Sequence, residues 1–131
     1  MPRFSCSLAA AILFSIAANF SAAELSPQLK AVRSVSREGQ GNEAAAAAVR
    51  TLSAASASDL LQILIGFEGA SPLAANYLRN AVESVVDRHL AANKPLPAKQ
   101  LEAFVLKRSN DPRARRLAFE VLAKVDLKAG D

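Results

Sequence analysis

The sequence predicts an all-α protein whose antiparallel helix pairs stack as a short α-solenoid of about three pairs. Three observations lead to this prediction. The chain beyond its first segment is rich in alanine, the residue with the highest intrinsic helix propensity. It contains no β-branched run bounded by turn residues, so no strand is expected. Several Ser-Pro and Asp-Pro pairs mark helix starts, because proline at the first helical position has no N–H to leave unsatisfied.

Residues 1–23 have the pattern of a secretory signal peptide. Arg3 gives a positive start, Leu8 to Ala18 is an apolar core, and Ser21-Ala22-Ala23 supplies the small residues that a signal peptidase reads. The apolar core is about half the ~20 residues that a spanning helix needs, so no stable membrane anchor is expected after cleavage. We therefore expect an exported protein, periplasmic or extracellular. Residues 24–131 would form its helical-repeat domain, or the start of a longer array.

Composition excludes several classes of protein. A chain with 51% hydrophobic and 21% charged residues is too apolar to be intrinsically disordered. Cys6 is the only cysteine and His89 the only histidine, which excludes an intramolecular disulfide framework and a His-rich metal site. The net charge of +4 is too mild for a dedicated nucleic-acid binder, so no nucleic acid is expected as a partner.

Three helices are expected in the first half of the mature chain. Ser26-Pro27 starts the first helix, and Gly39 and Gly41 are expected to stop it. Asn42-Glu43 and Ser58-Asp59 mark the next two starts, because each places an acid in a first turn, where the helix dipole favours it. The expected ranges are about 27–38, 43–55 and 59–67.

Three more helices are expected in the second half. Ser71-Pro72 starts a long helix whose apolar residues, from Leu73 to Leu90, recur close to a 3.6-residue period. Asp111-Pro112 starts the last helix. The connections between helices are short, which implies that neighbours in sequence are antiparallel partners. The expected ranges are about 72–92, 97–108 and 112–125, and the six helices group as three consecutive pairs.

The last of these helices resembles the second helix of a HEAT-like repeat of the PBS-lyase type. Its Asp111-Pro112 start is followed by Arg115, Ala118 and Leu122, which match the first-turn arginine, the buried alanine and the leucine four residues later. Ala114 departs from the pattern, since the family has a bulky residue before the arginine.

The likeness extends more loosely over residues 26 to 126. The chain is similar in this respect to the N-terminal part of longer secreted bacterial proteins with HEAT-like repeats. The resemblance implies an α-solenoid that acts as a protein-binding scaffold. It also implies that the first-turn arginine bonds to a neighbouring repeat.

The sequence offers no group of residues typical of catalysis or metal binding. His89 has no nearby serine or acid to act with, and it is expected to be a helix C-terminal residue that the dipole favours. Glu83 and Asp87 form an acidic i,i+4 pair that repels unless a base such as Arg79 lies between them. Gly39-Gln40-Gly41 lacks the strand and the lysine of a phosphate-binding loop. We expect a non-catalytic protein with no metal and no cofactor.

The strongest polar feature is a basic cluster that flanks the connection between the last two expected helices. This cluster has two explanations. It could form a patch that binds an acidic partner, protein or polyanion. It could also be structural, since Arg116 lies four residues before Glu120 and two of the cations lie at a helix C-terminus. The structural explanation is the stronger, and the patch stays open as the candidate partner-binding site. Its five cations are Lys107, Arg108, Arg113, Arg115 and Arg116.

The last expected helix also carries more apolar residues than one face can hold. In a repeat array a terminal unit needs a polar outer side, so this helix is expected to meet either another repeat or a partner. Two functions remain open from the sequence. The favoured one is an exported scaffold that binds a protein partner. The alternative is a regulatory or accessory helical module of an exported enzyme.

Overall fold

The computed structural model describes residues 25–129 of the chain. They form six α-helices and one 3₁₀ turn and contain no strand, which confirms the predicted all-α class. The predicted signal peptide lies outside the described residues. The elements are α1 (Ser26–Arg33), α2 (Asn42–Ser53), η2 (Ala57–Asp59), α3 (Leu60–Ile65), α4 (Pro72–Ala91), α5 (Ala98–Leu106) and α6 (Pro112–Ala129).

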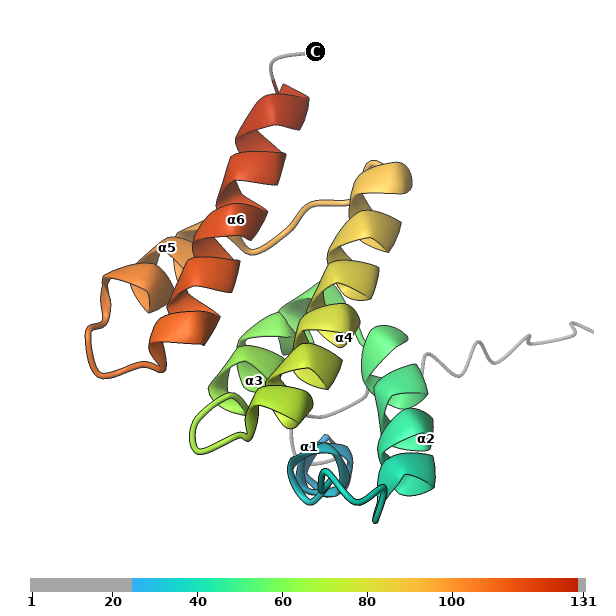
Figure 1. The fold of residues 1–131 in the computed structure, drawn as a ribbon. Coiled ribbons are helices and arrows are strands. Elements are labelled where there is room, and N and C mark those ends of the chain that lie inside the picture. The colour runs from blue at the N-terminus through green and yellow to red at the C-terminus, as the bar shows by residue number, and fades with distance from the viewer. Residues whose placement is uncertain (1–24, 130–131) are drawn as a thin grey trace, which may run out of the picture.

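Helix α4 is the longest element and lies at the centre of the molecule (Figure 1), in contact with α1, α2, α3 and α6. The middle of its apolar stripe is buried, from Leu78 to Val86, whereas Leu73, Tyr77 and Leu90 are half-buried; Leu78 has no exposed surface. Helices that follow one another in sequence also pack together: α1 on α2, α3 on α4, and α5 on α6. The largest buried side chains are those of Leu25, Leu52, Leu60, Ile63, Leu64, Leu78, Leu101 and Leu117.

Two of the predicted helix starts are confirmed by their hydrogen bonds. The Ser71 hydroxyl accepts the Ala74 N–H at 3.1 Å, and an Asp111 carboxylate oxygen accepts the Arg113 N–H at 2.8 Å. Each bond satisfies a backbone donor that has no partner inside the helix. Ser26 does not act in this way, because it is already the first residue of α1 and makes no capping bond.

The first helix is shorter than predicted. It ends at Arg33, where the Ser34 hydroxyl donates to the Ala31 carbonyl and a turn begins. Val35 is buried as expected, but it lies in this connection and not in the helix. Gly39 and Gly41 both have positive φ and shape the turn that leads into α2, so they do not stop α1. Glycine adopts this conformation without steric cost.

The third predicted helix divides into η2 and α3. The Asp59 carboxylate accepts the Ser56 N–H at 3.2 Å and the Ser56 hydroxyl at 2.6 Å, which fixes a tight 3₁₀ turn before α3 begins. Asp59 is the only charged side chain buried among the described residues, and these two bonds satisfy it. At the other end of the chain α5 stops at Leu106 and α6 runs on to Ala129, past the predicted end at residue 125.

Candidate partner-binding surface

Arg113, one of the five predicted cations, is held by the fold. Its guanidinium donates to the backbone carbonyls of Phe67 and Ala70, both at 3.1 Å, and pairs with the Asp111 carboxylate at 2.9 Å. The side-chain hydrogen bond from Arg113 lowers the pKa of Asp111, against the opposing effect of burial. Asp111 raises the pKa of Arg113 in return. Arg113 therefore links the start of α6 to the turn that follows α3.

Arg115 is engaged within its own helix pair. Its Nε donates to the Val105 carbonyl at 2.7 Å, near the C-terminus of α5. Arg115 is the residue that matches the HEAT-like arginine in sequence, and this bond stays inside the α5–α6 pair. The arginine that reaches the preceding pair is Arg113, two residues earlier.

The other three cations of the cluster are exposed. Arg116 is 82% exposed and makes one ion pair, with Glu120 at 3.2 Å. Lys107 and Arg108 make no hydrogen bond or ion pair to any other described residue through their side chains. The structure thus divides the predicted patch into two arginines that hold helices together and three cations that face solvent.

Basic side chains satisfy helix C-termini elsewhere in the molecule as well. Arg88 of α4 donates to the carbonyls of Ser53 and Ala55 at the end of α2, and Lys128 of α6 donates to the carbonyl of Leu90 near the end of α4. The last carbonyls of a helix lack partners and carry partial negative charge, which a cation offsets. Each of these contacts joins two helices, so we call Arg88, Arg113, Arg115 and Lys128 the carbonyl-bound cations.

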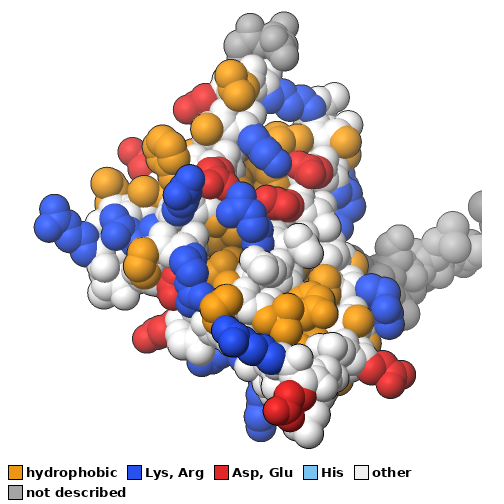
Figure 2. Space-filling view, in the orientation of Figure 1, with side chains coloured by type: hydrophobic (Ala, Val, Ile, Leu, Met, Phe, Trp, Pro, Cys, Tyr) orange, Lys and Arg blue, Asp and Glu red, His pale blue; other side chains and the backbone are white. Residues whose placement is uncertain are grey.

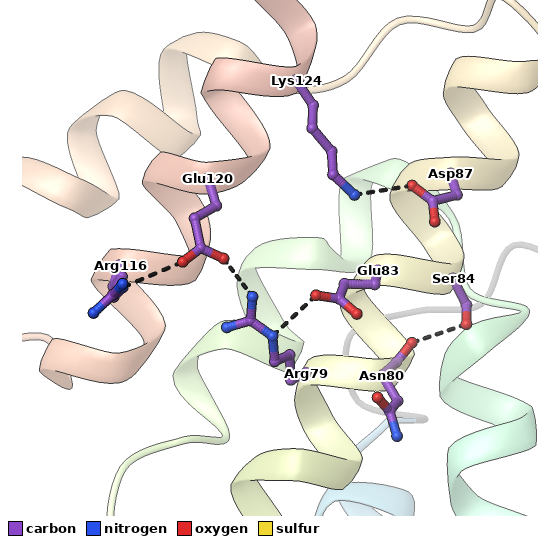
Figure 3. Close-up of polar contacts among 8 residues, drawn as sticks. All are labelled: Arg79, Asn80, Glu83, Ser84, Asp87, Arg116, Glu120 and Lys124. Atoms are coloured by element: carbon purple, nitrogen blue, oxygen red, sulfur yellow. Dashed lines mark hydrogen bonds and ion pairs between the residues drawn. The ribbon is translucent and has the colours of Figure 1, made fainter.

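A line of ion pairs joins α4 to α6 (Figure 3). Arg79 contacts both Glu83, at 2.9 Å, and Glu120. Lys124 pairs with Asp87 at 3.1 Å. The side-chain hydrogen bond from Arg79 is the main reason that the pKa of Glu120 is lowered. Glu83 and Asp87 therefore each have a cation of their own, Arg79 and Lys124, respectively.

An apolar groove lies between α5 and α6. It has a volume of about 520 Å³, and its large apolar lining residues are Val105, Leu106, Phe119 and Leu122. Leu106 is 71% exposed and Phe119 is 61% exposed. Figure 2 shows hydrophobic side chains at the surface over the last helix pair, with basic side chains beside them. The polar lining of the groove comes from Lys99, Glu102 and Asp126.

Phe119 does not lie on the core face of α6. It lies two residues from both Leu117 and Val121, which are buried, so a 100° step per residue turns it to the opposite side of α6. The sequence therefore held the signal, in the helical angle of Phe119 relative to its buried neighbours. The expectation that the last helix carries apolar residues on more than one face is confirmed.

The remaining candidates from the sequence lie apart from this groove. The His89 ring is half-buried, and its Nδ1 lies 2.8 Å from the Val85 carbonyl one turn earlier in α4. No cluster of three or more potential metal ligands occurs in residues 25–129. Over the same residues, no helix combines the length and the apolar character needed to cross a membrane.

Comparison of the chain with protein-family models, with curated proteins and with solved structures finds no match in any of the three. The HEAT-like resemblance of residues 111–122 therefore stays a prediction.

Proposed function

We propose that the chain is an exported, non-catalytic helical-repeat module of HEAT-like type that binds a protein partner through the α5–α6 surface. We define this surface by the groove residues Leu106, Phe119 and Leu122 and the adjacent cations Lys107 and Arg116. The signal-peptide pattern of residues 1–23 supports export to the periplasm or the extracellular space. The pairwise packing of successive helices supports a repeat architecture.

The exposed apolar groove carries this proposal. A monomeric protein rarely leaves neighbouring large apolar side chains uncovered unless they meet a partner. Here Leu106 and Phe119 stand beside the partly buried Val105 and Leu122, so a partner would find a concave apolar floor rather than single exposed residues. Solvent-facing cations next to this floor would give the surface a charged rim, which is typical of protein interfaces.

The proposal is tested by affinity capture from the exported fraction of the native host, followed by mass spectrometry. Phe119→Glu places a charge in the groove and should abolish co-purification of the partner. Arg116→Glu should weaken it to a lesser extent. Arg113 is unsuitable as a test residue because it holds α6 to the turn after α3.

Ile65→Glu is the matched control. Ile65 is 56% exposed, but it lies on α3 and not on the α5–α6 surface, so its substitution should leave capture unchanged. Capture that is insensitive to Phe119→Glu, or equal loss with both variants, would contradict the proposed surface.

A further inference from the structure

The end of the α5–α6 pair at its connection is strongly basic. Residues 107–116 carry five cations and a single acid, Asp111. Asp111 is already paired with Arg113, and the next acid along α6, Glu120, is shared by two arginines. The positive charge of this end is therefore not balanced within the part of the chain that the structure describes. We call its remaining cations the basic end: Lys107, Arg108, Arg115 and Arg116.

Three cations of the basic end have no carboxylate partner among residues 25–129. Lys107 and Arg108 are exposed, and Arg115 bonds to a backbone carbonyl, that of Val105. The connection that carries the first two lies at the edge of the molecule (Figure 1). Uncompensated surface cations attract acidic groups of a partner and repel basic ones. The basic end therefore selects for negative charge.

The charges along the groove between α5 and α6 change sign from one end to the other. The two helices are antiparallel, since Val105 near the end of α5 meets Arg115 near the start of α6. The groove therefore runs from Leu106, beside the basic end, back along α5 toward the first residues of that helix. Over this stretch its polar lining is one cation and two acids: Lys99, Glu102 and Asp126.

We propose that the partner binds through an amphipathic helix whose acidic first turn meets the basic end and whose apolar side chains enter the α5–α6 groove. The inference rests on the proposed function, because it names the segment that this surface takes. The dipole of a helix favours acids in its first turn and bases in its last turn. A helix in this orientation matches the groove, which is basic at one end and has Glu102 and Asp126 further along. Docking of an apolar helix face in a groove is a common mode of recognition.

The two acids in the groove disfavour a uniformly negative partner. A polyanion or an anionic membrane that covered the basic end and the apolar floor together would bring its charges against Glu102 and Asp126. A segment with acids at one end only meets the cations and avoids this repulsion. The same distribution of charge therefore favours an acidic protein segment over both alternatives.

The first experiment selects binders from a random peptide library displayed on phage, with the purified chain as the target and its Phe119→Glu variant for counter-selection. We expect the selected peptides to carry apolar residues three and four positions apart, with acids before them in sequence. The peptides are then synthesised, and their binding is measured by fluorescence anisotropy. Selected peptides without acids, or with acids along their whole length, would overturn the inference.

The second experiment reverses the charge of the basic end. The double variant Lys107→Glu/Arg108→Glu should slow the association of a selected peptide about tenfold or more at low salt, and the remaining rate should depend less on salt. Lys30→Glu/Arg33→Glu is the matched control, because it makes the same change of charge at two exposed cations of α1. Equal slowing by both double variants would show a general effect of net charge and would overturn the basic end as the contact.

Failure of this inference is distinguishable from failure of the proposed function. Selected peptides that bind in a Phe119-dependent way but carry no acids exclude the acidic helix and keep the α5–α6 surface. A selection that yields no Phe119-dependent peptide contradicts both.

Discussion

The four helices α1–α4 and the last pair α5–α6 differ in where their large apolar side chains lie. In the first part they are buried or half-buried, and Ile65 is its one exposed large apolar residue among those described. The shorter last pair exposes three: Leu106, Phe119 and Leu127.

The two parts also differ in what joins them. The first part is held by an aliphatic core around α4. The last pair packs against α3 and α4, and its buried residues Leu101, Leu117 and Val121 belong to the same apolar cluster. A line of ion pairs and the Arg113 bonds to backbone carbonyls join it as well. The first part therefore uses its apolar residues for its own stability, whereas the last pair leaves some of them at the surface, where we propose that a partner binds.

The largest expected effect is in the core of the first part. Leu78→Ala removes a fully buried side chain from the centre of α4 and should lower the free energy of unfolding by roughly 2–5 kcal/mol. Urea denaturation followed by circular dichroism measures it. A loss below about 1 kcal/mol would mean that α4 does not carry the core as described.

A substitution at the junction between the two parts should lower the free energy of unfolding by a smaller amount. Arg113→Met removes the bonds to Phe67 and Ala70 and leaves Asp111 without its ion-pair partner, so we expect a loss of about 1–2 kcal/mol. Arg116→Met is the control at an exposed ion pair and should change stability by less than about 0.5 kcal/mol. If both variants lose the same free energy of unfolding in urea denaturation, Arg113 is no more important to the fold than the solvent-facing Arg116.

Acid should weaken the junction before it weakens the core. The pKa values of Asp111 and Glu120 are lowered in the folded state by Arg113 and Arg79, respectively. Their contribution is therefore present above the ordinary carboxyl pKa and is lost as the pH falls through the folded-state value. Melting temperature measured from pH 7 to pH 3 should fall, and Glu120→Gln should make that fall shallower. An unchanged slope in this variant would exclude Glu120 as a contributor.

The smallest effect is expected at the exposed groove. Leu106→Ser replaces a side chain that is mostly exposed, so the free energy of unfolding should change by less than about 0.5 kcal/mol. Urea denaturation of this variant beside Leu78→Ala tests the comparison directly. A large loss at Leu106 would show that the groove belongs to the folding core and is not available to a partner.

Much of the fold could be predicted from the sequence because its signals are local. The 3.6-residue period of α4 and the Ser71 and Asp111 caps depend on residues within one or two turns of each other. The end of α1 was missed since Gly39 and Gly41 are the obvious stop signals, whereas the helix ends earlier, at a serine that bonds back to its own last turn.

The site was harder to predict, because it depends on contacts between distant parts of the chain. The sequence identified the basic cluster but could not separate Arg113, whose partners lie more than 40 residues away, from Arg116, whose partner is one turn away. The groove itself needed both the helical angle of Phe119 and the position of α5 beside it. Only the first of these can be read from the sequence.

The carbonyl-bound cations have a consequence for sequence variation. Arg88, Arg113, Arg115 and Lys128 all donate to main-chain oxygens, and every amino acid offers the same oxygen whatever its side chain. These bonds therefore restrict the donors and place no restriction on the side chains of the residues that accept them. In any set of sequences that keeps this fold, the acceptor side chains should follow their own packing and not the identity of the donor. These contacts should leave no trace of covariation, although Arg88, Arg113 and Lys128 reach carbonyls in distant parts of the chain.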